Sequence, residues 1–152
     1  MKIDIPEYMP DWIKQHIQLY LENPEKAHLW DSSLGGGSGL LHTLLLITRG
    51  RKSGELRPLP LIYGEDNGNY IVIASKGGSP DHPAWYLNLQ STPECEIRVG
   101  TKRMNALARS ADAHERQHLW EKMAKLYPPY DDYQQAAGVR EIPVVILEPL
   151  NR

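Results

Sequence analysis

The chain has 152 residues, a formal net charge of −2 and 24% charged residues, which suits one domain with one substantial core and is too short for two. A single cysteine, Cys95, excludes an internal disulfide, and no segment approaches the roughly twenty apolar residues that span a bilayer. The first residues carry acids and a proline instead of the apolar run of a secretory signal, so we expect a cytoplasmic protein. A pI near 6.3 without a basic stripe argues against a nucleic-acid partner.

The first predicted element is an amphipathic helix over residues 8–22, which ends before Asn23 and Pro24. Its apolar face fits a core, a second copy in a homodimer, or weak association with a membrane surface. Because that face carries few cations, core or dimer contact is favoured. A glycine-rich stretch over 35–39 follows, and without a preceding strand it is interpreted as a flexible linker. We therefore divide the chain into an N-terminal helix and linker, 1–39, and a second unit, 40–152.

From residue 40 onward the pattern favours short β-strands joined by turns, with two further helices. The predicted strands cover 44–48, 56–63, 69–75, 95–99, 102–109 and 142–147, and the predicted helices cover 83–90 and 112–127. An Asn-Gly pair within 65–69 is typical of a hairpin turn. Many short antiparallel strands with few helices indicate an α+β fold built on a small barrel.

The segment 47–57 is the most informative for function. It places cations and glycines between two predicted strands, and the cations are Arg49, Arg51, Lys52 and Arg57. Such a turn presents backbone N–H groups and positive charge to one small volume, which suits a phosphate or carboxylate. The alternative is a solvated basic hairpin, since exposed charges are the norm. A second segment, Ala-Ser-Lys-Gly-Gly over 74–78, favours the anion site.

Several ordered motifs between residues 41 and 149 resemble the deazaflavin-dependent nitroreductase family. These motifs are Thr48-x-Gly-Arg-Lys-Ser-Gly54, Arg57-x-x-Pro60, Ala74-Ser-Lys-Gly-Gly78, His82-Pro-Ala-Trp-Tyr-Leu-Asn-Leu89, Tyr127-Pro-Pro-Tyr-Asp-Asp-Tyr133 and Ile142-Pro-Val-Val145. The resemblance implies a split β-barrel of the FMN-binding-like kind. It also implies an oxidoreductase that passes hydride from the reduced deazaflavin coenzyme F-420 to a small-molecule acceptor such as a quinone, nitro compound or enone. An FMN-dependent or FMN-binding protein and a non-catalytic deazaflavin-binding protein are the alternatives.

The resemblance also assigns residues to the coenzyme, whose tail carries a phosphate, a carboxylate and a polyglutamate chain. The tail-binding positions match Arg51, Lys52, Ser53 and Arg57. The second binding segment matches Ala74, Ser75, Lys76, Gly77 and Gly78. Pro60 matches the position that lines the ring pocket. The planar guanidinium of arginine can form two hydrogen bonds at once to a phosphate or carboxylate, whereas the lysine ammonium acts as a point charge.

On the acceptor side, the family positions correspond to Tyr127, Tyr130 and Tyr133. We expect these tyrosines to contact the substrate from an irregular segment that acts as a lid, with packing as the alternative for Tyr127. Tyr130 and Tyr133 are the catalytic candidates, because either phenol can supply or relay a proton or stabilise developing negative charge. Solvent is the alternative proton source.

Two further positions complete the predicted acceptor site. Ile62 stands two residues after Pro60, where some family members carry a tyrosine, and Tyr63 follows on the opposite face of the strand. The acceptor pocket is therefore expected to be more apolar in this chain. Trp85 is a substrate-contact candidate for which core packing is the favoured alternative.

The sequence His114-Glu115-Arg-Gln-His118 matches the H-E-x-x-H pattern of zinc metalloproteases. The pattern leaves two positions free, and it falls where the resembling family has a charged surface helix. We interpret it as a solvated helix face and predict no metal site.

Overall fold

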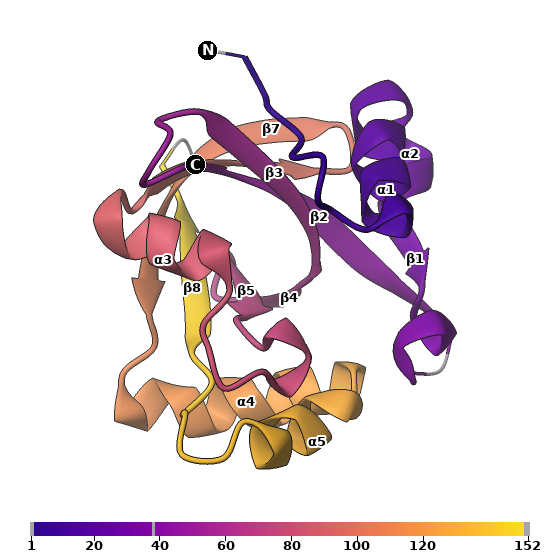
Figure 1. Cartoon of the computed structure of the whole chain (residues 1–152). Helices are drawn as coiled ribbons and strands as arrows, with labels where there is room; N and C mark the ends of the chain where they lie inside the picture. Colours follow the sequence, from indigo (N-terminus) through magenta and orange to yellow (C-terminus); the bar gives the residue numbers. More distant parts are fainter. Residues whose placement is uncertain (1, 38, 151–152) are drawn as a thin grey trace.

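The computed structural model describes residues 2–37 and 39–150, which form a curled antiparallel half-barrel with helices around it (Figure 1). The strands are β1 (Leu29–Asp31), β2 (Leu40–Arg49), β3 (Leu56–Ile62), β4 (Gly64–Asp66), β5 (Asn69–Ile73), β6 (Glu94–Val99), β7 (Lys102–Ser110) and β8 (Val144–Pro149). The helices are α1 (Asp11–Glu22), α2 (Pro24–Ala27), α3 (Ala84–Ser91), α4 (Ala113–Leu126) and α5 (Pro129–Ala136), with 3-10 turns η1 (Ser32–Gly35) and η2 (Lys76–Gly78). Each helix of this described part is too short or too polar to cross a membrane.

Strand β2 is the centre of the sheet, because three strands pair with it. It pairs antiparallel with β1 through residues 40–42, with β3 through 43–49 and with β6 through 45–47. The path continues from β6 through β7, β8 and β5 to β4. Every residue of β2 from 43 to 48 is buried, because helices or the curled sheet itself cover both of its faces at that level.

Alternate residues of β2 face two different apolar clusters, as the pleat of a strand requires. Leu44 and Leu46 face the core that the curled sheet encloses. Leu45 and Ile47 face the other way and pack in a cluster with Tyr20 of α1. The N-terminal helix therefore lies directly on the outside of the half-barrel.

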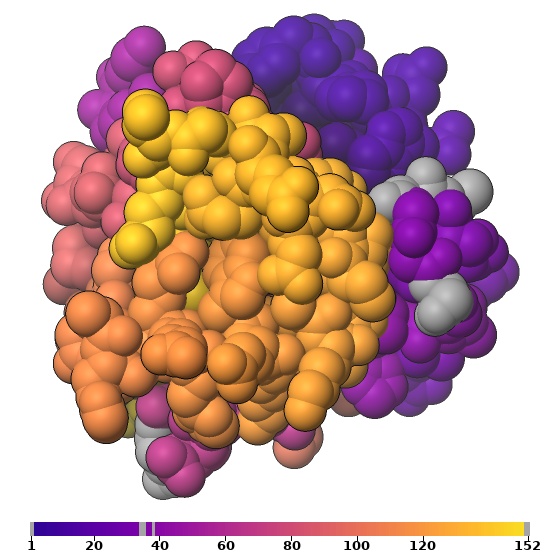
Figure 2. All heavy atoms as spheres, turned by 90° about the horizontal axis from the view of Figure 1, so that it is seen from below, coloured from indigo at the N-terminus to yellow at the C-terminus, as the bar shows by residue number. Residues whose placement is uncertain are grey.

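Helices α4 and α5 lie side by side across one end of the molecule, as Figure 2 shows. Leu119 and Met123 of α4 are buried in a third apolar cluster with residues of β5, β8 and α5. Asp112 caps α4, because its side chain accepts a bond from the Glu115 N–H at 2.8 Å while the Glu115 carboxylate accepts from the Asp112 N–H at 3.1 Å. This capping box fixes where the helix begins.

The six predicted strands and the later two predicted helices are all present, with shifted ends. The last strand begins at Val144 instead of Ile142. In the region predicted to be helical from residue 8, helix α1 begins at Asp11, because Pro10 is extended with ψ 144°. The short strands β1 and β4 carry no alternation long enough to be seen in the sequence. Of the stretch 35–39, residue 38 lies outside the described residues.

One expectation about secondary structure is wrong. The segment from Tyr127 to Tyr133 was expected to be irregular because Pro128 and Pro129 interrupt it. In the structure Pro129 is the first residue of helix α5. Proline suits that position, since a first-turn N–H has no partner within the helix and the ring presets φ. The two prolines therefore end α4 and start α5.

Candidate functional site

A cavity of about 780 Å³ lies between α1, β3, the end of β5 and α5. Its lining brings together residues that are far apart in the chain, from Trp12 to Tyr133. They are Trp12, Ile13, His16, Trp30, Thr43, Leu59, Pro60, Leu61, Ile62, Ile73, Ser75, Lys76, Gly77, Pro83, Trp85, Tyr127, Tyr130 and Tyr133. Nine of these, namely Pro60, Ile62, Ser75, Lys76, Gly77, Trp85 and the three tyrosines, are site residues predicted from the sequence.

The three tyrosines form one contact cluster at the α5 side of the cavity. Tyr127 and Tyr130 pack edge to face with ring centroids 4.9 Å apart, and Tyr133 lies 6.2 Å from each of them. The hydroxyls of Tyr127 and Tyr133 are 3.2 Å apart. Burial raises the pKa of Tyr130 and of Tyr127 well above the usual value. These two phenols therefore keep their protons at neutral pH and act as hydrogen-bond donors.

Sequence reasoning did not assign Trp12 and Trp30 to the site. Their rings stack with centroids 6.2 Å apart and planes 22° apart, although one comes from α1 and the other from β1. Trp12 is 56% exposed, so the pair stands where the cavity meets solvent. The apolar face of the first helix was the available signal for Trp12, whereas nothing local marked the three-residue strand that carries Trp30.

His16 and Thr43 are polar lining residues that sequence reasoning also did not assign. The Thr43 hydroxyl donates to the Ala27 carbonyl oxygen at 2.9 Å, and His16 Nε2 lies 3.0 Å from the same oxygen. Because a carbonyl only accepts, Nε2 carries the hydrogen. Both side chains therefore tie α1, α2 and β2 together where they form the cavity wall.

Strand β3 forms another wall through residues 59–62. In the described part of the chain it pairs over its length with β2 alone, so its other edge is open. The carbonyl of Leu56 faces that edge, since it accepts from the Asp4 N–H at 2.8 Å. By alternation Pro58, Pro60 and Ile62 present their backbones the same way. Two of these three lack an N–H, which protects the edge from pairing with another strand.

The turn after β5 places Ser75, Lys76 and Gly77 at the cavity. The other two residues predicted in this segment lie behind the wall. Ala74 is fully buried. Gly78 is buried beneath α5, where an added Cβ would lie 2.8 Å from the Tyr133 carbonyl oxygen. These two residues position the turn and do not line the cavity.

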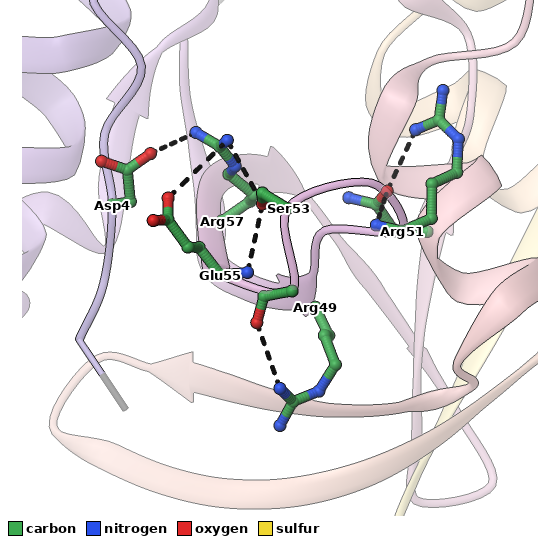
Figure 3. Close-up of polar contacts among 8 residues, drawn as sticks. Asp4, Arg49, Arg51, Ser53, Glu55 and Arg57 are labelled. Atoms are coloured by element: carbon green, nitrogen blue, oxygen red, sulfur yellow. Dashed lines mark hydrogen bonds and ion pairs between the residues drawn. The ribbon is translucent and has the colours of Figure 1, made fainter.

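The basic loop between β2 and β3 spreads its arginines, as Figure 3 shows. Arg57 pairs with Asp4 and lies 3.9 Å from Glu55. Arg51 Nη1 donates to Asn88 of α3 at 3.1 Å, and Arg49 Nη1 donates to the loop carbonyl of Gly54 at 3.1 Å. Each guanidinium faces a different neighbour. The expectation that the cations converge on one small volume is therefore corrected.

Arg51 is nevertheless linked to the cavity through α3. Both its backbone N–H and its side chain donate to Asn88 Oδ1, and the Asn88 amide donates to Thr48 Oγ1 at 3.1 Å. Trp85, which lines the cavity, stands three residues before Asn88 and so on the same side of the helix. Lys52 and Ser53 are exposed next to Arg51, so this side of the loop faces solvent.

The His-Glu-x-x-His segment lies on α4, away from the cavity lining. His114 and His118 are exposed, and His118 Nε2 lies 3.5 Å from Asp66. Hydrogen bonds from Arg109 lower the pKa of Glu115 to about 2, and the Asp112 N–H adds to this effect. Within residues 2–37 and 39–150, no three His, Cys, Asp or Glu side chains group as metal ligands. Glu115 acts here as a helix cap.

The site can hold a flat ring with an anionic tail. Indole, phenol, proline and leucine groups surround most of the cavity, which suits a planar apolar body. Lys76 and the glycine backbone beside it offer charge and close approach at one side.

Residues 22–149 match the family model described as F420H(2)-dependent quinone reductase. The chain is 34% identical over 150 residues to the F420H(2)-dependent quinone reductase Rv1261c of Mycobacterium tuberculosis, covering 90% of this chain and 95% of that protein.

Solved structures are similar to this chain as well. One described as an F420-H2 dependent reductase, FDR-A, is 42% identical with a TM-score of 0.64 and covers 70% of this chain and 93% of that one. Another, described as a domain-swapped dimer, is 35% identical with a TM-score of 0.67 and covers 91% and 98%. The haem storage protein HutZ of Vibrio cholerae, 15% identical with a TM-score of 0.55 and 72% and 82% coverage, shares the fold alone.

Proposed function

The chain belongs to the F420H(2)-dependent quinone reductase family, and we propose that it transfers hydride from reduced coenzyme F420 to an electron-poor acceptor. A quinone is the first candidate for this acceptor, and nitro compounds and enones are further candidates. The observation that carries the proposal is the single cavity that joins the turn at residues 75–77 to the tyrosine cluster. One chamber thereby adjoins both a place for an anionic coenzyme and a place for a flat acceptor.

The residues present fit the coenzyme. We assign its acidic tail to Ser75, Lys76 and Gly77 at the cavity and to Arg51 and Lys52 along α3. Charge-assisted bonds of this kind contribute about 1.5 to 3 kcal/mol each when they are shielded, and less at exposed positions such as Lys52. Arg57 reaches the tail only by sharing its guanidinium with Asp4.

The ring belongs between Pro60 of β3 and Trp85 of α3, which both face the cavity. When bound, the reduced deazaflavin supplies the hydride. The protein contributes positioning and exclusion of water, which is most of what such a transfer needs from it. Trp12 and Trp30 close the solvent side, so the N-terminal unit is a working part of the chamber. We assign an amphipathic role to α1, with one face on the half-barrel and one at the chamber mouth.

The acceptor lies against Ile62 and the three tyrosines. Tyr130 keeps its proton because burial raises its pKa, so it donates a hydrogen bond to the acceptor oxygen as negative charge develops there. Tyr133 is positioned by its contact with the Tyr127 hydroxyl and is the second donor. The apolar Ile62 side chain widens the range of acceptors, since it places no hydrogen-bond requirement on them.

A titration of purified protein with reduced F420 and with FMN, followed by turnover with a soluble quinone, tests the proposal. We expect micromolar affinity for F420, weaker binding of FMN, and quinone-dependent oxidation of the reduced coenzyme. Preferential binding of FMN, with purification of a yellow protein, would instead support the FMN-dependent alternative. Tight F420 binding without turnover on quinone, nitro compound or enone would support a coenzyme-binding protein.

We also propose a homodimer. Leu29 and Leu40 are about half exposed or more, and they lie on paired strands at the end of the sheet where β1 joins β2. Exposed apolar residues on neighbouring strands favour association with a second copy. Light scattering after gel filtration separates a dimer from a monomer. Binding to lipid vesicles, reduced by Trp12→Ser, would identify the alternative of weak membrane-surface association.

A further inference from the structure

Arg140 is a buried cation that the site described above does not include. It follows α5 in the connection to β8, and only 9% of the residue is exposed. Its position is set by α5, since its N–H donates to the Ala137 carbonyl and its carbonyl accepts from the Gln134 amide at 2.8 Å. A buried guanidinium requires partners for its donors, and the identity of those partners is informative.

The partners of the Arg140 guanidinium all lie in the segment that follows β5. Its Nη1 donates to the Ala74 carbonyl at 3.0 Å, its Nη2 to the Ser75 carbonyl at 2.7 Å and its Nε to the Ser79 carbonyl at 2.9 Å. Nη1 also lies 3.1 Å from Nδ1 of His82, which accepts because arginine only donates. One side chain therefore orders the backbone from residue 74 to residue 82.

These bonds determine which way the backbone N–H groups point. In a trans peptide the carbonyl and the N–H of the next residue point in opposite directions. Because the carbonyls of Ala74 and Ser75 face Arg140, the N–H groups of Ser75 and Lys76 face away from it. Ser75 and Lys76 line the cavity and Arg140 does not. The N–H groups are therefore turned to the cavity side.

The dihedral angles complete an anion cradle. Ser75 is right-handed helical with φ −79° and ψ −39°, and Lys76 and Gly77 are left-handed with φ of 47° and 62°. A right-handed residue followed by a left-handed one makes successive N–H groups converge, as in many phosphate sites. Among the described residues, the N–H groups of Ser75, Lys76 and Gly77 donate to no protein acceptor.

We propose that Arg140 is a positioning residue that holds Ser75, Lys76 and Gly77 in the conformation that presents three backbone N–H groups to the anionic part of the coenzyme. Arg140 contacts neither the cavity nor the ligand and acts through the carbonyls behind the turn. Through its bond to His82, which precedes Pro83 and α3, it also fixes the start of the segment that carries the lining residues Pro83 and Trp85. This inference rests on the proposed function, since the coenzyme supplies the anion.

The first test measures the free protein. Arg140→Met removes the guanidinium donors while keeping an unbranched apolar side chain as far as the position of Nε. We expect amide hydrogen exchange over residues 74–82 to rise by about tenfold or more, because the turn loses the bonds that order it. Arg140→Lys keeps the charge but has no planar fork, so it should show the same effect in part and protects the test if Arg140→Met fails to fold.

Arg116→Met is the matched control. Arg116 is a partly buried arginine that also binds backbone near the same connection. It donates to the Ile142 carbonyl at 2.9 Å and to the Gln134 side chain at 3.2 Å. It reaches none of residues 74–82. This variant should lower stability without raising exchange in the turn.

The second test measures coenzyme affinity. We expect the Kd for F420 to rise about 10- to 100-fold in Arg140→Met, by analogy with the loss of groups that orient metal ligands. It should rise less in Arg140→Lys. Arg116→Met should bind as the wild type does. Wild-type affinity in Arg140→Lys, with normal exchange, would show that charge alone suffices and would overturn the inference.

The two failures are distinguishable. Wild-type protein that binds no F420 contradicts the proposed function, and the exchange measurement still reports on the turn. Wild-type protein that binds F420 while Arg140→Met binds it equally well contradicts the inference alone.

Discussion

The turn after β5, which lines the cavity, and the loop between β2 and β3, which reaches it only through α3, are built in opposite ways. The turn presents backbone N–H groups and is held from behind by one buried arginine, Arg140. The loop presents side-chain charge. It is held at one side by the bonds of Arg51 to Asn88, and next to it Arg57 of β3 pairs with Asp4 and Glu55 near the surface. The comparison suggests a rigid cradle near the chamber and an adaptable grip farther out.

This difference has a physical origin. A backbone N–H loses no side-chain entropy when it binds a ligand. Its orientation, however, has to be fixed before binding by buried hydrogen bonds elsewhere in the turn. An exposed arginine or lysine loses rotamer freedom on binding, and salt screens its charge. The turn should therefore control tight placement of the coenzyme, while the loop should adjust to tails of different length.

Replacing Gly78 should have the largest effect on stability, because Gly78 is the residue of the turn on which α5 packs. Gly78→Ala puts a Cβ 2.8 Å from the Tyr133 carbonyl oxygen at a φ of 84°, so we expect a loss of about 2 to 5 kcal/mol in the free energy of unfolding. Urea denaturation measures it. Gly54→Ala in the loop is the control, since φ is 76° but nothing lies within 4 Å of the added atom; its loss should be about 1 to 2 kcal/mol. Equal losses would mean that packing on α5 does not distinguish the two segments.

The acceptor side of the chamber is tested by Tyr130→Phe. We expect kcat with a quinone to fall about a hundredfold while the Kd for F420 is unchanged, because a donor to developing charge is lost. Burial raises the pKa of Tyr130 well above the usual tyrosine value of about 10. The protonated donor therefore persists through neutral pH, and kcat should not fall as the pH approaches that usual value. Tyr63→Phe is the control, since Tyr63 is also buried with a raised pKa but lies in the enclosed core. Unchanged kcat in Tyr130→Phe would make solvent the proton source.

The loop is tested by the double substitution Arg51→Ala and Lys52→Ala. We expect the Kd for F420 to rise about tenfold at low salt and by less at high salt, because these charges are exposed. Isothermal titration at two salt concentrations measures both. Lys102→Ala with Arg103→Ala removes the same charge from the exposed start of β7 and should leave the Kd unchanged. A salt-independent loss would contradict an adaptable surface grip.

Releasing Arg57 should have the smallest effect. Asp4→Asn breaks its ion pair with the N-terminal segment, and we expect about two- to fivefold tighter F420 binding, with a loss of less than about 1 kcal/mol in stability. Glu7→Gln, which breaks the exposed pair with Lys14, is the control and should change neither. An unaltered Kd in Asp4→Asn would remove Arg57 from the predicted tail-binding set.

Much of the fold was predictable because its signals are local. Strand β3 and helix α4 were recognisable from alternation and helical spacing, and the Asn-Gly hairpin at Gly68 from its turn chemistry. Helix α5 was not, because Pro128 and Pro129 are consistent with a broken segment as well as with a helix start. Only packing of Tyr130 into the apolar cluster decides between them.

The predicted site also divides into residues that local motifs mark and residues that only tertiary contacts reveal. Motifs marked Ser75, Lys76 and the tyrosines, which the structure brings to one cavity. No motif marks Arg140, because a single arginine in a connecting segment is ordinarily an exposed surface charge. Its role follows from bonds to carbonyls that are distant in the chain, and no periodicity reports such contacts.

By itself the sequence determined the order of most strands and helices, the kinship with deazaflavin reductases, and the residue types at the cavity. Tertiary structure decided which of them meet: the stacking of Trp12 on Trp30, the divergence of Arg51 and Arg57, and the burial of Arg140. The reason is that propensity and alternation act between near neighbours along the chain, whereas these contacts depend on how β2 pairs with three strands and on which helix each face then covers.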